Sequence, residues 1–318
     1  MITYNQESYI LKSIQSAINQ KTSFEYEIII ADDKSTDSTN RLLDQLAEKN
    51  NTKISLINNK VNIGASRNLL NVLKHAKGKY IAILEGDDYW QDTNKLQSCF
   101  EFMENNIEFS VIHHKVNVVT NENLIIGELP KDIFRNNYMS LEDLILNDSF
   151  MATCSIFFRN YFKTDEFTIP ESLFTIRNMA DWPLNIFLAS RGKIGYVDTN
   201  MASYRVASGK SSWSKRNYSE ILLDAIKINN VINKELDFKY DQIIKNKIIK
   251  YELAICVDYL LHLRLKKFID LYYEIKIQNI EKIYFIIKKL FSIKYYFYYG
   301  AFKMLFMRIN KKIKSILK

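Results

Sequence analysis

The sequence contains few of the residues that interrupt regular structure, with 8 Gly and 3 Pro among 318 residues. Average usage, roughly 7% and 5%, would give about 22 Gly and about 16 Pro in a chain of this length. The shortage excludes collagen-like and Pro/Gly-rich disordered proteins, and it argues against an all-β fold with many tight turns. The hydrophobic share of 47% and the charged share of 25% are those of an ordinary globular protein.

Cysteine and long apolar runs are also scarce. The three Cys show no spacing typical of a disulfide framework, and an odd number in a sequence without a recognisable signal peptide fits a reducing compartment. No apolar run reaches about 18 residues, so no membrane-spanning helix is expected. The four His lack metal-ligand spacing, and no Gly-rich phosphate loop is present. Zinc proteins, P-loop enzymes and dinucleotide-dependent dehydrogenases are therefore disfavoured.

Acidic residues are absent from one part of the chain. Residues 282–318 hold ten Lys and Arg and no Asp or Glu, so the remaining 281 residues carry 34 basic and 36 acidic side chains. The net charge of +8 therefore comes from the last 37 residues. A basic segment of this kind says more about a binding surface than about the substrate of the rest of the chain.

Short apolar segments alternate with helical patterns over the first 90 residues. Alternation of this kind predicts βαβ units and an α/β fold with a mainly parallel central sheet flanked by helices. Ligands bind such sheets beyond the carboxyl ends of the strands. The predicted strands are residues 25–31, 54–57 and 79–84, and the predicted helices are residues 7–20, 37–50 and 66–76. Further along, we predict a strand at 151–159, a helix starting at Asp181 and long helices after Asn217.

The first strand of this pattern is unusually short. Only Met1-Ile2-Thr3 precede Tyr4-Asn5 and the first predicted helix. We therefore expect that several strand residues upstream of Met1 are absent from this sequence.

The strongest chemical signal is the segment AILEGDDYW, residues 82–90. A predicted strand ends in Glu85, then Gly86, then Asp87 and Asp88. Such carboxylates repel one another unless a cation lies among them. Mg²⁺ typically binds one or two carboxylates together with substrate phosphates, so the segment favours a metal–phosphate site. The alternative is an acidic turn in which Asp88 caps the following helix.

A second acidic pair, Asp32-Asp33, follows the predicted strand in IIIADDKSTDST, residues 28–39. A carboxylate at that sheet edge can accept hydrogen bonds from a base or a ribose. The alternative is that Ser35 or Asp37 caps the next helix and that the acidic pair is solvated.

Two further segments carry candidate residues. In residues 62–68, Asn62-Ile63-Gly64 form a tight turn, and Arg67 lies in the first turn of the next helix, where it can neutralise a diphosphate or remain a surface cation. In residues 178–190, Asp181 stands at a helix start, with Pro183 just inside it. Asp181 is either an N-cap or, if it faces a cleft, a general base.

In this order the motifs resemble those of the family 2 inverting glycosyltransferases, which have the GT-A fold. The resemblance covers residues 1–215, through Thr3-Tyr4-Asn5, Asp32-Asp33, Asn62-x-Gly64 with Arg67, Glu85-Gly86-Asp87-Asp88 and Asp181-Trp182. It implies transfer of a sugar from a nucleotide-diphosphate sugar, most simply a UDP-sugar, to a hydroxyl of a glycan or lipid-linked acceptor, with inversion. Such a reaction belongs to the synthesis of cell-surface polysaccharide or lipopolysaccharide.

The resemblance also implies roles for single residues. Asp181 matches the catalytic carboxylate. Asp33 would contact the nucleobase with Asp32 in support, Glu85 would approach the ribose, and Asp87 with its neighbour Asp88 would bind Mn²⁺ or Mg²⁺. The implied donor site consists of Thr3, Tyr4, Asn5, Glu7, Asp32, Asp33, Asn62, Gly64, Arg67, Glu85 and Gly86.

The sequence departs from the family pattern at two positions. Ala180 stands where an acid often precedes the catalytic carboxylate, and Ala207 stands where relatives often carry a His. Arg205, Lys210 and Ser211 are candidates to replace the contact of that His with metal or phosphate. An inactive nucleotide- or glycan-binding relative and a sugar nucleotidyltransferase therefore stay open as alternatives.

The C-terminal part, residues 216–318, is predicted to be a helical extension with a basic amphipathic tail. On a helical wheel of residues 302–318 the apolar side chains form one stripe and the cations lie opposite. This pattern favours an anionic membrane surface as the partner of residues 282–318 and gives no support for nucleic acid. We expect a cytoplasmic protein peripheral to the inner face of the cell membrane, unless the stripe packs on the catalytic domain instead.

Overall fold

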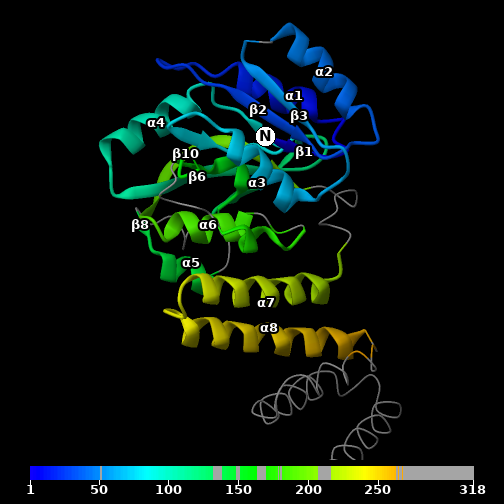
Figure 1. Ribbon diagram of the computed structural model, residues 1–318, viewed down its shortest axis with the longest axis vertical. Helices are drawn as coiled ribbons and strands as arrows, with labels where there is room; N and C mark the ends of the chain where they lie inside the picture. Colours follow the sequence, from blue (N-terminus) through cyan, green and yellow to red (C-terminus); the bar gives the residue numbers. More distant parts are fainter. Residues whose placement is uncertain are drawn as a thin grey trace, which may run out of the picture. The chain divides into compact units, whose positions relative to one another are not determined.

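A computed structural model describes residues 1–50, 52–131, 138–147, 151–162, 170–177, 179, 181–206 and 216–262, together with residues 264 and 267. Strands and helices alternate through the first 90 residues, as expected for an α/β fold (Figure 1). The elements there are β1 (Ile2–Thr3), α1 (Ile10–Ile18), β2 (Ile28–Asp32), α2 (Thr39–Lys49), β3 (Ile54–Asn58), α3 (Ala65–His75), β4 (Tyr80–Ala82) and β5 (Tyr89–Trp90).

The N-terminal strands form a parallel sheet in the order β1-β2-β3. β1 lies at one edge, where Ile2 pairs with Ala31 of β2 and also forms a parallel bridge with Glu85, just after β4. This bridge connects the first sheet to the second. As a result β1, β2 and β4 end at the same side of the molecule.

The second sheet has mixed strand directions. Its order is β4-β9-β6-β10-β5, with β7 added on β6 and β8 on β10. β6 and β10 pair in parallel along most of their length, whereas the other pairs are antiparallel. The added elements are α4 (Lys95–Asn105), β6 (Phe109–Val119), β7 (Ile125–Leu129), β8 (Tyr138–Met139), α5 (Leu141–Asn147), β9 (Phe157–Arg159), α6 (Asp181–Ala189) and β10 (Lys193–Arg205).

Helices cover both faces of the sheets, and each face has its own apolar core. α1 and α2 lie on one face of strands β1–β3 and α3 lies on the other (Figure 1). Ile10, Ile14 and Leu43 pack in the first core together with Cys99 and Met103 of α4. The second core contains apolar residues of α3, α5 and α6: Leu69, Leu73, Leu144, Leu184 and Leu188. Because α6 is buried along almost its whole length, Asp181 at its first residue is held firmly in place.

Two long helices follow, α7 (Tyr218–Glu235) and α8 (Asp241–Leu261). α7 begins with a capping box between Asn217 and Glu220, and its Ile228 and Ile232 belong to the second core. The chain divides into two compact units, Met1–Ile248 and Ile249–Lys318. α7 thus lies in the first unit, while a functional boundary after residue 215 stays a prediction.

The expected elements are largely found, with one clear difference. The predicted strand at 151–159 contains a short 3-10 turn, Thr153–Ser155, and only Phe157–Arg159 is a strand. The amphipathic tail lies outside the described residues. In the described part of the chain, no helix combines the length and hydropathy needed to cross a membrane.

Candidate functional site

Three strand ends bring the predicted site residues together. In the register of the sheet, Thr3 pairs with Asp32, and Ile2 pairs with both Ala31 and Glu85. The loops after β1, β2 and β4 therefore begin side by side at the carboxyl edge of the sheet. This edge is where α/β proteins bind their ligands.

The loops after β1 and β2 are joined by reciprocal hydrogen bonds. Asn5 has a φ of +53°, and its Oδ1 accepts a bond of 2.7 Å from the amide of Thr36. Glu7 accepts a bond of 2.9 Å from the amide of Ser38, and Asp37 accepts one of 3.2 Å from the amide of Glu7. Asn5 and Glu7 therefore shape this edge, and the exposed Tyr4 side chain is free to contact a ligand.

The buried carboxylates of Asp32 and Asp33 are used largely within the protein. Asp32 accepts bonds from the hydroxyl and the amide of Ser35. Asp33 accepts bonds of 2.8 Å each from the amides of Ile63 and Gly64, and one of 3.0 Å from Asn59. Asp33 thus fixes the loop before α3, and its contact with a nucleobase stays a prediction.

The start of α3 is attached to the segment that precedes α6. Ser66, which is fully buried, donates its hydroxyl to the carbonyl of Ile176 and accepts a bond of 3.2 Å from the amide of Met179. The amide of Ser66 also donates to the carbonyl of Arg177 at 3.1 Å. Asp181 follows two residues after Met179. The hydrogen bonds of Ser66 therefore connect the start of α3, where the sugar donor is predicted to bind, to the segment that leads to Asp181, the predicted catalytic residue.

Gly64 is required at the close approach of these two segments. Its φ is +89°, a conformation that favours glycine, and a Cβ there would collide with the side chain of Arg177. The guanidinium of Arg177 donates to the carbonyl of Asn62 at 3.2 Å and to its side-chain oxygen. Asn62 in turn donates to the carbonyl of Asp33 at 3.0 Å. Arg177 was not identified from the sequence.

The acidic turn after β4 is held from several directions. Gly86 donates its amide to the carbonyl of Ile2 at 3.1 Å, and a Cβ at Gly86 would collide with Gln6 and Thr3. Asp88, only 1% exposed, accepts a bond of 2.7 Å from the amide of Arg205. The guanidinium of Arg205 donates to the carbonyl of Asp87 at 2.8 Å. The turn is therefore built into the sheet by its backbone as much as by its carboxylates.

The carboxylates of this turn all have raised pKa values. Burial raises the pKa of Glu85 well above its usual range, and the charges of Asp88, Asp87 and Asp181 raise it further. Burial also raises the pKa of Asp87, and that of Asp88 more strongly. The guanidinium of Arg205 opposes the rise at both Asp87 and Asp88. An added cation would relieve this repulsion.

Asp181, from a distant part of the sequence, acts electrostatically on the same cluster. Its carboxylate lies near enough to Glu85 to raise the pKa of that residue. Burial raises the pKa of Asp181 itself, although the amide of Trp182 partly offsets this. Burial raises the pKa of the Tyr204 phenol, and the charges of Glu85, Asp88 and Asp181 raise it further. Tyr204 was not identified from the sequence, where it had no distinguishing pattern.

The carboxylate oxygens of the turn are the type that Mg²⁺ and Mn²⁺ bind. A cation here would be held partly by these oxygens and partly by oxygens of the bound substrate. Asp87 is half-buried, while Asp88 Oδ2 receives no hydrogen bond from a described nitrogen or oxygen donor and lies near the Cys154 thiol. Within the described ranges, no three His, Cys, Asp or Glu side chains converge on one metal position. A cation here would therefore need phosphate oxygens as further ligands.

The other candidate residues divide by exposure. Arg67 is exposed in the first turn of α3, as expected for a residue that meets an anionic ligand. Arg205 is 4% exposed, and its guanidinium also bonds to Thr120, Asn121 and Asn123, so it braces the turn from within. Lys210, Ser211 and Ala207 lie outside the described residues.

A comparison of sequences identifies the family of the chain. A sequence model of glycosyl transferase family 2 matches residues 1–165, more than half of the chain. The chain belongs to glycosyltransferase family 2. The chain is 35% identical over 204 residues to the uncharacterized protein Mb1547 of Mycobacterium bovis, a match that covers 64% of this chain and 57% of that one.

A relative with an assigned activity is also found. The UDP-Glc:alpha-D-GlcNAc-diphosphoundecaprenol beta-1,3-glucosyltransferase WfgD of Escherichia coli is 33% identical over 142 residues, which cover 44% of this chain and 53% of WfgD. The chain thus spans a little over half the length of the curated relatives it matches.

Solved structures show that the chain has the GT-A fold. TarS residues 1–349 from S. aureus, in complex with UDP-GlcNAc, align with a TM-score of 0.59 at 20% identity, over 80% of this chain and 71% of TarS. The mannosyltransferase PcManGT from Pyrobaculum calidifontis, in complex with GDP-Man and Mn²⁺, aligns with a TM-score of 0.52 at 14% identity, over 95% and 82% of the two chains.

Proposed function

We propose that the chain is an inverting glycosyltransferase that moves a sugar from a UDP-sugar to a hydroxyl of a glycan or lipid-linked acceptor during the synthesis of cell-surface polysaccharide. One observation carries the proposal: Asp181, at the start of a buried helix, lies close enough to the acidic turn Glu85–Asp88 for its charge to raise the pKa of Glu85. WfgD acts on a diphosphoundecaprenol-linked sugar, and TarS binds UDP-GlcNAc. These relatives support the class of donor and of acceptor.

Asp181 has the properties of the general base. Its pKa is raised toward neutral pH, and a general base works best when its pKa is near the pH of the reaction. Its place at the start of the buried helix α6 holds the side chain in position. The acceptor oxygen bonds to the anomeric carbon as the bond from that carbon to the diphosphate breaks. The hydroxyl proton goes to Asp181, and the nucleoside diphosphate leaves with the bonding electrons. A single displacement of this kind inverts the configuration at the anomeric carbon.

The donor is held at the edge formed by the loops after β1, β2 and β4. Tyr4 is an exposed side chain of this edge, and the exposed Arg67, in the first turn of α3, carries the positive charge that a diphosphate needs. The buried carboxylates of Asp32 and Asp33 keep the loops in place through the bonds to Ser35, Ile63 and Gly64. Hydrogen bonds to the ribose come from Glu85 in this proposal.

Asp87 is the proposed protein ligand of Mn²⁺ or Mg²⁺, with Asp88 beside it. When bound, the cation supplies positive charge that stabilises the departing diphosphate. We expect Asp87→Ala to weaken UDP binding at least about tenfold in the presence of Mn²⁺ and to change it little in EDTA, since only metal-assisted binding is lost. Asp44→Ala, at an exposed position of α2, is the control. Equal loss of affinity with and without the cation would contradict the assignment.

The donor class is tested by ligand-induced stabilisation. Nucleotide sugars with uracil, guanine, adenine and thymine bases are each added with Mn²⁺, and the melting temperature is measured, because a ligand that binds the folded state raises it. We expect the largest increase with a UDP-sugar. Transfer is then measured with that donor and a polyprenyl-diphosphate-linked sugar. Binding of the donor without transfer or donor hydrolysis would favour an inactive relative, and release of diphosphate from a nucleoside triphosphate would favour a nucleotidyltransferase.

We also propose that residues 282–318 attach the enzyme to the cytoplasmic face of the membrane. The support is the segregation of apolar and basic residues along 302–318, a pattern that suits anionic lipid. Flotation with vesicles of anionic and of neutral lipid tests this. We expect binding to anionic vesicles alone, lost when five cations are replaced by Gln. The replaced cations are Lys303, Arg308, Lys311, Lys314 and Lys318. Equal flotation of the two chains would contradict it.

A further inference from the structure

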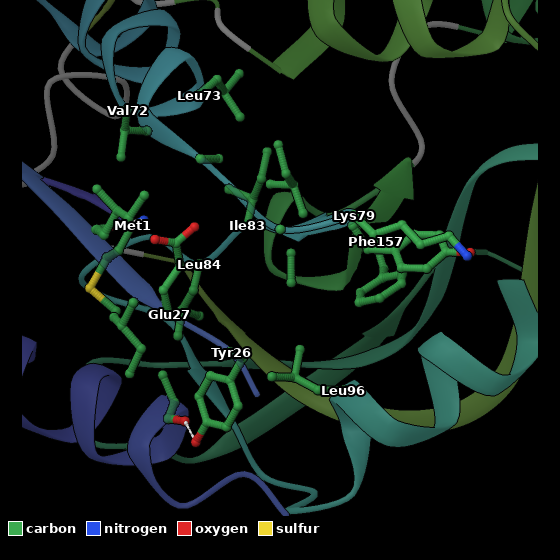
Figure 2. A pocket seen from close by; sticks show the side chains of 18 of the residues that line it. Met1, Tyr26, Glu27, Val72, Leu73, Lys79, Ile83, Leu84, Leu96 and Phe157 are labelled. Atoms are coloured by element: carbon green, nitrogen blue, oxygen red, sulfur yellow. Dashed lines mark hydrogen bonds between the residues drawn. The ribbon is translucent and has the colours of Figure 1, made fainter. Parts of the chain in front are cut away.

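The second core, around α3, α5 and α6, is apolar. Figure 2 shows part of it, where Val72, Leu73 and Ile83 line a cavity of about 280 Å³. Burying a charge in such surroundings is costly unless the charge has specific partners. Lys247 of α8 is nevertheless only 6% exposed, and Ile244, one turn earlier on the same helix, belongs to this core. The partners of Lys247 therefore indicate why a cation is buried there.

Lys247 connects two other helices. Its Nζ donates a hydrogen bond to the carbonyl of Ile145 in the last turn of α5. The last four carbonyls of a helix have no partner within the helix, and the negative end of the helix dipole favours a cation there. The same Nζ lies over the ring of Trp182, 4.5 Å from its centroid. Within the unit Met1–Ile248, one side chain of α8 thus contacts both α5 and α6.

Trp182 is the neighbour of Asp181 at the start of α6. Its side chain is 5% exposed and belongs to the second core, so the cation over its ring is shielded from water. Cation–π contacts are stronger when they are desolvated, and tryptophan is the aromatic residue that forms them best. The amide of Trp182 in turn donates a hydrogen bond to the carboxylate of Asp181. The position of the indole ring therefore determines where that amide, and with it the carboxylate, lies.

We propose that Lys247 is a positioning residue for Asp181: its cation fixes the indole of Trp182, and the amide of Trp182 then holds the carboxylate toward the acceptor hydroxyl. The inference rests on the proposed function of Asp181 as the general base. A general base must lie within hydrogen-bond reach of the proton that it removes, so a small displacement of the carboxylate lowers the rate strongly. Catalysis in this chain thus depends on α8 as well as on the edge of the sheet.

Lys247→Met tests the positioning role, because methionine has a similar length but neither charge nor donor. We expect kcat to fall at least about tenfold and the Kd for UDP to change less than about twofold. The melting temperature should change by less than about 4 °C, since the lost bond to Ile145 and the relief of a buried charge oppose one another. Lys247→Arg keeps a cation over the ring and should hold kcat within about threefold of the wild type. Lys250→Met, at an exposed lysine of α8, is the control.

A double variant shows whether Lys247 acts through Asp181. In the Asp181→Asn chain, Lys247→Met should lower the residual rate less than about twofold, because the carboxylate that Lys247 positions is already gone. A tenfold loss in both backgrounds would contradict the proposal, and so would a kcat for Lys247→Met equal to that of Lys250→Met. A loss of kcat that Lys247→Arg does not rescue, together with a melting temperature lower by more than about 10 °C, would make Lys247 a purely structural residue.

Hydrogen exchange at the amide of Trp182 provides a measurement that needs no activity. Lys247→Met should speed this exchange at least about fivefold relative to the wild type and to Lys250→Met. If the wild type transfers no sugar, or if Asp181→Asn transfers as well as the wild type, the proposed function of Asp181 fails. The exchange rate then still decides whether Lys247 orders the start of α6. An unchanged exchange rate in Lys247→Met would overturn the inference in either case.

Discussion

The backbone amide of Arg205 donates a hydrogen bond of 2.7 Å to the carboxylate of Asp88, which connects the end of β10 to the acidic turn after β4. The guanidinium of the same residue donates to the carbonyl of Asp87 and to the side chain of Asn123, both at 2.8 Å. Tyr9 lies against its other side, with the ring centroid 4.4 Å from the guanidinium carbon. One buried cation thus determines where the acidic turn lies.

Replacing Arg205 tests this bracing role. Arg205→Ala removes the hydrogen bonds that the guanidinium donates to Asp87, Thr120, Asn121 and Asn123, so we expect the free energy of unfolding to fall by about 3 kcal/mol. Arg205→Lys keeps the charge but lacks the planar fork, and we expect a loss between that of Ala and the wild type. Urea unfolding measures both. Lys227→Ala, which removes an exposed ion pair with Asp224, is the control and should cost under about 1 kcal/mol. Equal losses at Arg205 and Lys227 would contradict the role.

Ser66 is expected to act on the reaction through Asp181. Ser66→Ala removes the bonds to Ile176 and to Met179, which lies two residues before Asp181, so the proposed catalytic carboxylate should shift while the hydrogen bonds of Asp33 to the loop before α3 remain. We expect kcat to fall at least about tenfold and KM for the donor to change less than about twofold. Steady-state kinetics with the donor and acceptor measure both constants. Ser23→Ala, at an exposed serine, is the control. A higher KM at unchanged kcat would place Ser66 in donor binding instead.

The sequence predicts the first half of the fold well because its signals there are local. Ile28–Ile30 form an apolar run followed by two acids, and strands and helices alternate at regular lengths. β6 and β10 are harder to recognise. β6 contains His113, His114 and Lys115, and the register of β10 shifts between Val197 and Asn200, so neither shows a clean alternation of apolar and polar residues. Tertiary pairing between the two strands compensates for the weak local pattern.

The same contrast holds for the site. The order of the motifs predicts that Glu85, Asp33 and Asp181 are binding or catalytic residues, because carboxylates can accept hydrogen bonds or protons. The sequence does not show that Asp33 uses its carboxylate on Ile63 and Gly64, since both partners are backbone amides 30 or 31 residues away. Arg205 is a similar case, because an arginine is normally expected on the surface. Its acceptors lie more than 80 residues away in the chain.

Asp181→Asn tests the general base. The amide keeps the shape of the side chain but cannot accept the proton, so we expect transfer to fall by about 10² to 10⁴-fold and the Kd for UDP to change less than about twofold. The pH profile adds a second check. Activity of the wild type should decline as pH falls through the raised pKa of Asp181, since the base must be deprotonated. Initial rates between pH 4 and 8 measure this decline of activity in the wild type, and the residual activity of Asp181→Asn should not show it. Parallel loss of UDP binding would make Asp181 structural.

The buried amine of Met1 should make the free energy of unfolding depend on pH. Burial lowers the pKa of this amine to about 5, from its usual value of about 8. Between these two pH values the unfolded chain holds a proton that the folded chain has released, so the free energy of unfolding should rise with pH across that interval. The contribution is at most on the order of 4 kcal/mol, because each pKa unit corresponds to about 1.4 kcal/mol.

Acetylation of the amine provides the comparison, because it removes the charge and keeps an N–H that can donate to Ile29. Glu85, Asp87, Asp88, His113 and His114 also titrate differently in the folded state, but they are present in both chains and cancel in the difference. Urea unfolding at pH 5, 6, 7 and 8 should therefore show the acetylated chain more stable by an amount that shrinks as pH rises. A constant difference across the four pH values would mean that the Met1 amine stays charged in the folded protein.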